Sequence, residues 1–216
     1  EDKNFTVYNG KDLNSEINYV SREEFLNRYH IDGKDKTIVG IMARLDLVKD
    51  HETFIKAAYS VLKERDDVLF LIGGTGNDEE RLKSMVEKMG ISNNVHFLGW
   101  IDDQYSFFNA IDINVLTSVS ESFPYVILEG ARLKKTIIST DVGGISDLIK
   151  NGYNGWLIEV GDSEALAKYI NSFLEDKSRI KLLGDNLYKT VEDGFSADKM
   201  ALSHFQIYEK IIESRR

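Results

Sequence analysis

The sequence contains no cysteine and only one proline, and its hydrophobic runs are all short. Without cysteine, the protein cannot have a disulfide scaffold, a thiolate metal site or a cysteine nucleophile. None of its apolar runs approaches the roughly 18 residues that a membrane-spanning helix needs. The formal net charge of −9 excludes a nucleic-acid binder that works through a basic face. The remaining composition, with 42% hydrophobic residues and mixed charge, predicts a globular chain with a substantial core.

The start of the chain also lacks an initiator methionine, because the first residues are Glu1-Asp2-Lys3. We therefore expect a piece of a longer protein. The lack of cysteine and of a signal-like leader predicts a reducing, cytoplasmic environment. No two of the four histidines stand four residues apart, so the sequence predicts no metal site.

Short apolar runs alternate with amphipathic stretches from residue 37 to residue 175. Strands are predicted at residues 37–42, 68–72, 95–98, 111–116, 136–139 and 156–160. Helices are predicted at residues 21–29, 50–63, 78–89, 102–109, after Pro124, and at 146–150, 163–174, 178–192 and 196–212. The alternation predicts an α/β fold, a Rossmann-like parallel sheet of about six strands with helices on both faces. Residues 1–36 are a leading segment, and residues 37–216 form the domain and its closing helices.

Two glutamates, Glu121 and Glu129, flank the only proline with seven residues between them. They follow the fourth predicted strand, at the carboxyl edge where open α/β sheets bind ligands. Pro124 suits the first turn of the next helix, and Ser122 is its predicted N-cap. Inside that helix Glu129 is surrounded by apolar residues, and a ribose diol would satisfy its carboxylate. The alternative is a surface pair between Glu129 and Arg132, three residues further along.

Arg44 and Lys49 lie in the loop after the first predicted strand, at the same edge. Arginine offers a planar fork for phosphate oxygens and lysine a point charge, so together they suit a diphosphate without a metal. The alternative is a solvated loop in which both cations pair locally with Asp46 and Asp50.

Backbone groups at this edge form a further set of candidates. The helix after Pro124 begins with free amides that would face an anion. They belong to Phe123, Tyr125 and Val126. Gly74, within the glycine-rich residues 73–76, and Gly99 allow close approach of a ligand, and the backbone up to Ile101 could meet a nucleobase. Tight turns at the glycines and a solvent-shielded Trp100 are the plainer alternatives.

Taken in order, these segments resemble the C-terminal half of a group 1 (GT4-type) retaining glycosyltransferase. The resemblance rests on Ala43-Arg44-Leu45 with Lys49, Gly73-Gly74-Thr75-Gly76, Val95–Gly99, Glu121–Glu129, Asp141–Gly144 and Asn151–Gly155. The Glu-x7-Glu element is the signature of that family, and the resemblance covers about residues 6 to 212. It implies the GT-B fold, in which two Rossmann-like domains face each other across a cleft. This chain would be the domain that binds the nucleotide-sugar donor.

The resemblance also implies roles for the candidates. Arg44 and Lys49 would neutralise the diphosphate of the donor, Glu121 would contact its sugar, and these three would be the catalytic residues. Glu129 would hold the ribose and Gly74 would lie near the phosphates. The other donor contacts would come from the backbone at Gly99 and Ile101, beside the base, and from the amides of Phe123, Tyr125 and Val126. No metal and no cofactor is expected, and a UDP-sugar is the expected donor.

The implied reaction is retaining transfer to a saccharide or lipid acceptor in bacterial polysaccharide or glycolipid synthesis. The acceptor would bind a separate N-terminal domain, so we expect this chain alone to be inactive. The full-length protein would be cytoplasmic, with peripheral contact to the inner face of the membrane, and would not bind nucleic acid. Two other functions stay open, a nucleotide-sugar epimerase of the same fold and a non-catalytic partner subunit. Asp50 departs from the glycine usual in the family and would place a carboxylate beside the phosphate ligand.

Overall fold

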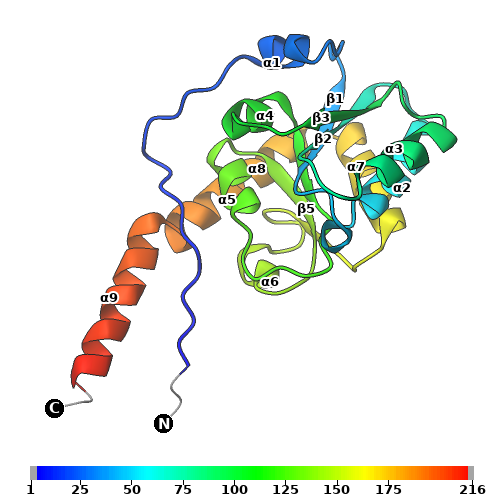
Figure 1. Cartoon of the computed structure of the whole chain (residues 1–216). Helices are drawn as coiled ribbons and strands as arrows, with labels where there is room; N and C mark the ends of the chain where they lie inside the picture. The colour runs from blue at the N-terminus through cyan, green and yellow to red at the C-terminus, as the bar shows by residue number, and fades with distance from the viewer. Residues whose placement is uncertain (1–3, 214–216) are drawn as a thin grey trace.

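The protein, described by a computed structural model over residues 4–213, is built on a six-stranded parallel sheet (Figure 1). Its strands are β1 Thr37–Met42, β2 Val68–Gly73, β3 Val95–Gly99, β4 Ile113–Leu116, β5 Thr136–Thr140 and β6 Trp156–Ile158. The strand order is β3-β2-β1-β4-β5-β6. This is the order of a doubly wound nucleotide-binding sheet, and its winding reverses between β1 and β4. The predicted α/β fold with about six parallel strands is confirmed.

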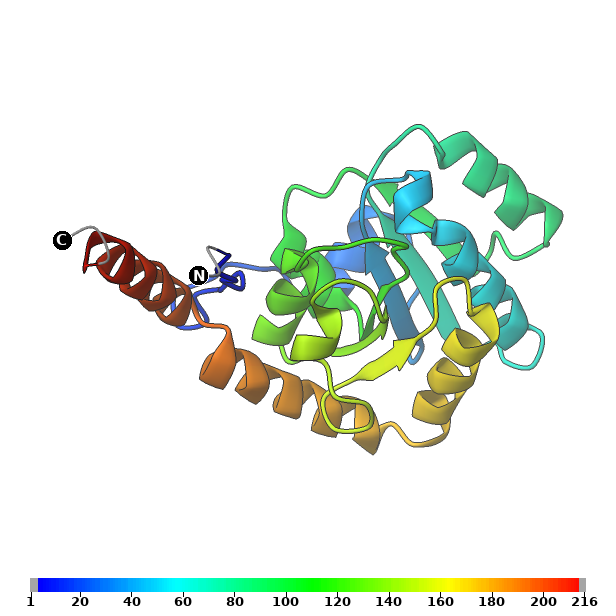
Figure 2. The same ribbon diagram turned by 90° about the horizontal axis from the view of Figure 1, so that it is seen from below.

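Helices cover both faces of the sheet, which confirms that part of the prediction as well (Figure 2). One layer contains α2 His51–Leu62, α3 Glu79–Lys88 and α7 Ser163–Glu175. The other contains α1 Arg22–Arg28, α4 Gln104–Ala110, α5 Tyr125–Arg132, α6 Ile145–Leu148 and α8 Ser178–Gly194. A short 3₁₀ helix, η1 Leu47–Lys49, precedes α2, and α9 Ala197–Glu213 closes the described chain.

The central strand β2 is apolar along its whole length, because both of its faces are buried under helical layers. Ile38 packs toward α1 and α4, whereas its neighbour Val39 packs toward α2. In the layer of α2, the rings of Phe54 on α2 and Phe70 on β2 meet edge to face, with their centroids 5.7 Å apart. The packed core on both faces of the sheet therefore fixes the carboxyl ends of the strands, from which the loops of the site begin.

The leading segment and α9 extend from the body together (Figure 1). They are joined at Lys11, whose amide donates to the carbonyl of Phe195 at 3.0 Å and whose carbonyl accepts from Ala197 at 3.2 Å. None of the residues of α9 is fully buried. Further along the leading segment, Phe25 of α1 packs against Phe107 of α4, with ring centroids 6.2 Å apart. The division of the chain at residue 36 stays a prediction.

Candidate active site at the sheet's switch point

The loops after β1 and β4 meet at the point where the winding of the sheet reverses. Nζ of Lys49 lies 2.5 Å from Oε1 of Glu121, and the hydroxyl of Ser118 donates to the same oxygen at 2.7 Å. The pair is largely shielded from solvent, because the side chains of Lys49 and Glu121 are 23% and 12% exposed. The structure thus brings together two of the predicted catalytic residues, which come from different loops.

Hydrogen bonds tie these two loops together behind the ion pair. The hydroxyl of Thr117 donates to the carbonyl of Lys49 at 2.9 Å, and the amide of Val119 donates to the carbonyl of Val48 at 2.8 Å. Asp46 caps η1 by accepting from the Lys49 amide. The backbone of Lys49 is therefore fixed on both sides, which limits where its ammonium can lie.

Asp50 does not lie in this site as a free carboxylate. Its φ of 44° is left-handed, a conformation that glycine adopts most easily. Its side chain caps α2 instead, accepting from the amide of Thr53 at 3.3 Å and from the hydroxyl of Thr53 at 2.6 Å. The carboxylate of Asp50 is therefore engaged by Thr53, and its effect on a bound phosphate stays a prediction.

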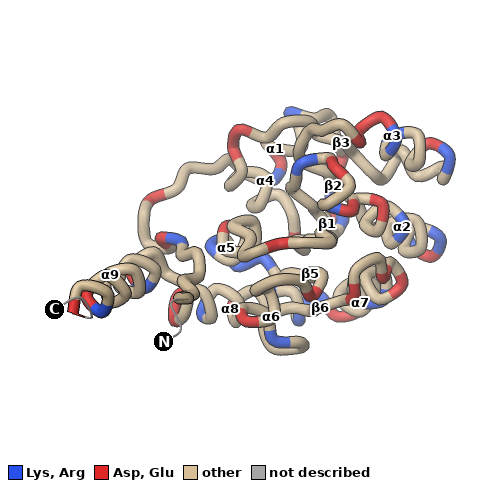
Figure 3. Tube along the Cα trace, turned by 60° about the horizontal axis from the view of Figure 1, so that its bottom comes forward, with Lys and Arg blue, Asp and Glu red and all other residues tan. Residues whose placement is uncertain are grey.

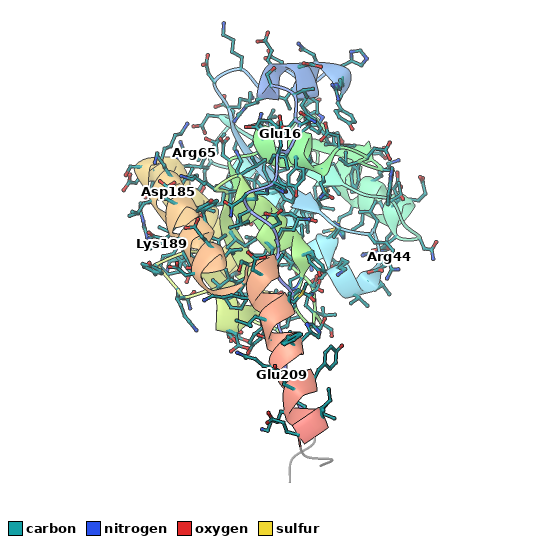
Figure 4. The ribbon with its side chains drawn as sticks, turned by 90° about the vertical axis from the view of Figure 1, so that its left-hand side faces the viewer. Glu16, Arg44, Arg65, Asp185, Lys189 and Glu209 are labelled. Carbon is teal, nitrogen blue, oxygen red and sulfur yellow. The ribbon has the colours of Figure 1, made fainter. Side chains whose placement is uncertain are left out.

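Arg44 is not part of the cluster. Its side chain is 73% exposed, and its Nε lies 2.5 Å from Oδ2 of Asp46 (Figure 4). The alternative of local pairing is therefore found for Arg44 with Asp46, but not with Asp50. Lys49 does not follow this alternative, since its ammonium pairs with Glu121. The guanidinium of Arg44 can contact a diphosphate bound beside Lys49 only if its side chain rotates away from Asp46.

The loop after β5 supports the first glutamate from behind. Gly143 has a φ of 57°, and a Cβ at this position would lie 1.8 Å from the carbonyl oxygen of Glu121. The amide of Gly144 donates to the carbonyl of Ser122 at 2.9 Å. Only a residue without a side chain permits this approach, so Gly143 helps to set the position of Glu121.

The loops after β2 and β3 meet through Gly74. Its amide donates to the carbonyl of Gly99 at 2.7 Å, and a Cβ on it would lie 2.1 Å from the carbonyl oxygen of Ala43. Backbone packing alone therefore accounts for this glycine, whereas Gly99, with a φ of 69°, faces open space. Ile101 packs beside Gly73, and Trp100 is 71% exposed. The expectation of a shielded Trp100 is wrong, because the indole projects from the loop, where its N–H donates to Asp102 at 2.7 Å.

Glu129 lies on α5 with its side chain only 13% exposed. Its Oε1 accepts from Nζ of Lys11 at 3.0 Å and from Nε2 of Gln104 at 3.1 Å. The alternative pair with Arg132 is not formed, because Arg132 donates to Ser15 in the leading segment. Sequence reasoning missed both partners of Glu129. Lys11 lies 118 residues away and Gln104 lies 25 residues away, and no local pattern marks either of them.

The start of α5 differs from the prediction. The helix begins at Tyr125 and Pro124 takes the cap position, without a side-chain cap. The prediction of Ser122 as N-cap is wrong, because its carbonyl is turned back to accept from Gly144. Phe123 is buried against Phe195, whereas Tyr125 is 44% exposed. Within residues 4–213, no hydrogen bond occupies the amides of the predicted anion-facing residues. These are Phe123, Tyr125 and Val126.

Two histidines near the sheet are neutral at physiological pH. Burial lowers the pKa of His51 to about 4, and neither nitrogen of its ring has a hydrogen-bond partner among the described residues. Burial also lowers the pKa of His96 in β3. Over the described chain, no group of three His, Asp or Glu side chains is placed to hold a metal ion. The absence of a metal from the reaction stays a prediction.

A cavity of about 1350 Å³ opens at the other end of the sheet, between α1 and the start of α8. Its lining includes Thr37 and Asp112, at the amino ends of β1 and β4, and none of the predicted site residues. Charged residues of both signs are spread along the whole chain, so charge alone does not single out this region (Figure 3). Across the described residues, no helix has the length and apolar character to cross a membrane.

Comparisons with known proteins identify the family and the fold of this chain. The profile of the family described as "Glycosyl transferases group 1" matches residues 21–190. The chain is 30% identical over 173 residues to the capsular polysaccharide biosynthesis glycosyltransferase CapM of Staphylococcus aureus, covering 79% of this chain and 45% of that protein. The chain spans about half the length of the curated relatives it matches.

Two solved structures are similar to this one. Alr3699/HepE of Anabaena, determined in complex with UDP-glucose, superposes with a TM-score of 0.82 at 25% identity, covering 96% of this chain and 57% of that chain. The C-terminal domain of the group 1 glycosyl transferase LpcC from Francisella tularensis has a TM-score of 0.77 at 26% identity. That likeness covers 87% of this chain and 100% of the LpcC domain. The described fold therefore corresponds to the C-terminal domain of a GT-B protein.

Proposed function

Because this chain belongs to the group 1 glycosyltransferases, we propose that it binds the nucleotide-diphosphate sugar from which the complete enzyme transfers a sugar. The observation that carries the proposal is the arrangement of the Glu-x7-Glu pair. Glu121 and Glu129 both lie at the switch point of the sheet, on either side of the free amides that begin α5. A donor there would meet carboxylates for its hydroxyls and N–H groups for its phosphates.

Each group has a distinct task in this proposal. Glu129 accepts hydrogen bonds from the ribose, and Glu121 from the donor sugar. Lys49, already fixed beside Glu121, supplies positive charge to the diphosphate, and Arg44 joins it after leaving Asp46. The transition state of the transfer concentrates negative charge on the departing nucleoside diphosphate. Preplaced cations and amides stabilise that charge without needing to reorganise.

The amides at the start of α5 are the third part of this anion site. Helix N-termini attract phosphate through unpaired N–H groups and the helix dipole. Gly74 and the backbone at Gly99 and Ile101 line the approach to the phosphates and the base in the proposal. A set of cations and amides suffices to bind a diphosphate, so we propose metal-independent transfer. We propose retention of configuration only from the resemblance to the retaining glycosyltransferases.

The comparisons supply the substrate class of the proposal. The complex of the Anabaena protein with UDP-glucose supports a UDP-sugar as donor, and the relationship to the capsular polysaccharide enzyme CapM supports a role in bacterial polysaccharide synthesis. We further propose a saccharide or lipid-linked acceptor. We place the protein in the cytoplasm, with any peripheral membrane contact made by the complete protein. The acceptor would bind outside this chain, so the chain alone binds donor weakly and transfers nothing. Sugar transfer by the isolated chain would contradict that statement.

Calorimetric titration with UDP, GDP and ADP in the absence of metal tests donor binding. One nucleotide should bind, and Glu129→Gln should weaken that binding by about tenfold or more, since it removes a charged acceptor of ribose hydrogen bonds. Glu159→Gln is the matched control, because it makes the same change at an exposed position after β6. If no nucleotide binds at millimolar concentration, or if both variants lose affinity equally, the proposed donor site is wrong.

The family match speaks against a nucleotide-sugar epimerase. If the chain belongs to an enzyme, the complete protein should transfer a sugar, whereas a non-catalytic partner subunit should not. Assay of the complete protein with the nucleotide sugar whose diphosphate binds would therefore separate these two functions.

A further inference from the structure

Lys11 is an unexpected neighbour of the proposed ribose carboxylate. Its Nζ lies 3.0 Å from Oε1 of Glu129, and both side chains are mostly shielded, at 24% and 13% exposed. It comes from the leading segment, 118 residues away from Glu129 in the sequence. The pair resembles that of Lys49 with Glu121, so each glutamate of the Glu-x7-Glu element is held by a lysine from a distant segment.

The backbone of Lys11 is fixed, which distinguishes it from a surface lysine that meets a carboxylate by chance. Its N–H and C=O both bond to the junction of α8 and α9, at Phe195 and Ala197. The preceding Gly10 packs so closely there that a Cβ would lie 2.3 Å from the carbonyl oxygen of Ser196. The side chain therefore starts from a constrained position and reaches Glu129 from a defined direction.

The surroundings of the ammonium keep it charged. Burial acts to lower the pKa of Lys11, but the hydrogen bond and charge of Glu129 outweigh burial, and the pKa lies above its usual value. The rings of Tyr105 and Tyr125 flank the ammonium, with centroids 5.8 Å and 6.0 Å from Nζ. The Lys11 cation is therefore a stable part of the site over the physiological pH range.

The two oxygens of Glu129 have different environments. Oε1 accepts from both Lys11 and Gln104, which uses its two lone pairs. Oε2 accepts no hydrogen bond from any residue between 4 and 213. Oε2 is therefore available to accept hydrogen bonds from a ribose diol, and the bonds that hold Oε1 set the orientation of the carboxylate.

We propose that Lys11 is a positioning residue of the donor site, which with Gln104 holds Oε1 of Glu129 so that Oε2 is presented to the ribose hydroxyls. The inference rests on the proposed function and adds a residue to it. The competing possibility is that Lys11 blocks Glu129 and must be displaced, and it predicts an effect of the opposite sign.

Titration of the chain with UDP, GDP and ADP identifies the nucleotide to use, and its 2′-deoxy counterpart and pyrophosphate complete the set of probes. Lys11→Met keeps the apolar stem and removes the ammonium, whereas Lys11→Arg keeps the charge. Lys134→Met is the control for net charge, because Lys134 pairs with Asp185 at 3.0 Å, away from the site. Gln104→Leu removes the second donor to the same oxygen, and thermal unfolding confirms that each variant is folded.

Lys11→Met should weaken binding of the ribonucleotide by about tenfold, the usual effect of losing a charge-assisted contact. Its preference for the ribonucleotide over the 2′-deoxy form should fall toward one, pyrophosphate binding should not weaken, and Lys11→Arg should restore the preference in part. Gln104→Leu should lower the preference in the same direction. Combined with Glu129→Gln, Lys11→Met should cause no further loss, because Lys11 acts through that carboxylate.

Unchanged or tighter nucleotide binding by Lys11→Met would overturn the inference. Equal weakening of the ribonucleotide and its 2′-deoxy form would also overturn it, because that result indicates a purely structural role for Lys11. In those cases the proposed function survives, provided that Glu129→Gln still weakens nucleotide binding. Failure of the wild-type chain to bind any of the three nucleotides would overturn the proposed function, and the role of Lys11 with it.

Discussion

Lys49 and Glu121 are 72 residues apart in the sequence, yet Nζ of the first lies 2.5 Å from Oε1 of the second. The pair bridges the loops that follow β1 and β4, the two strands between which the sheet reverses its winding. The position of the first signature glutamate is therefore set by a loop on the other half of the sheet.

Removing the ammonium from this pair should destabilise the protein. Lys49→Met leaves a carboxylate that is 12% exposed with only Ser118 as donor, which should lower the free energy of unfolding by about 1–3 kcal/mol. Adding Glu121→Gln should recover part of that loss. Lys56→Met is the control, because its pair with Glu52 is exposed and should contribute less than about 1 kcal/mol. Urea unfolding measures all three, and equal effects of the two lysine changes would contradict the prediction.

Gly143→Ala should be more damaging than the same change at another left-handed glycine. At Gly143 the new methyl group would lie 1.8 Å from the carbonyl oxygen of Glu121, so the loop must move. At Gly161, which has a φ of 80°, nothing lies within 4 Å of the added carbon, and only backbone strain of about 1–2 kcal/mol remains. We expect Gly143→Ala to lower the melting temperature further and to weaken nucleotide binding, whereas Gly161→Ala should leave binding intact.

His51 should make stability fall with pH in a defined window. In the folded chain burial lowers its pKa to about 4, against 6.5 in the unfolded chain, so acid protonates the unfolded chain first. The contribution of neutral His51 to the free energy of unfolding is complete above pH 6.5 and is lost as the pH falls toward 4. This loss lowers the free energy of unfolding by about 3 kcal/mol. His51→Leu should remove that part of the pH dependence, measured as the difference between the two unfolding curves. The same substitution at exposed His204 should leave the window unchanged.

The apolar face of α9 should drive the isolated chain to self-associate. Leu202, Phe205, Tyr208 and Ile212 are 56–61% exposed on this helix. Apolar side chains gathered in this way favour association in water. Met200, on the same helix, is only partly exposed, and its sulfur accepts a hydrogen bond from the Gly10 amide.

Sedimentation at increasing concentration measures this association. Leu202→Glu combined with Phe205→Glu should abolish it, whereas Leu182→Glu on α8, 58% exposed in the wild type, should not. A wild-type chain that stays monomeric at high concentration would refute the prediction.

Much of the site could be predicted from the sequence because its residues follow strands. Parallel strands end at one edge, so a motif after β1 and a motif after β4 are brought together whatever the loops between them do. This is why Lys49 and Glu121 were assigned to the same site, and why six apolar runs sufficed to predict the sheet. Gly143 belongs to one of the segments that carry the family resemblance, but its contact with Glu121 was not predicted.

The partners that were missed have no periodic signal. Lys11 lies in an extended segment whose path depends on tertiary contacts with the α8–α9 junction, and periodicity cannot predict such a path. The cap of α5 was misplaced because Ser122 is a good local cap, but its backbone bonds to Gly144 instead. Trp100 was expected to be shielded because large aromatic residues usually are, and only the loop geometry places it in solvent.

The side-by-side course of the leading segment and α9 has a consequence for the order of the elements along the chain. Nζ of Lys210 lies 5.4 Å from the centre of the Phe5 ring, so both ends of the described chain lie close together. A short flexible linker could join them, and new termini could open at the exposed residues Asp176 and Lys177, between α7 and α8. A circular permutant made in this way should fold to the same sheet, because its helical layers do not depend on where the chain begins.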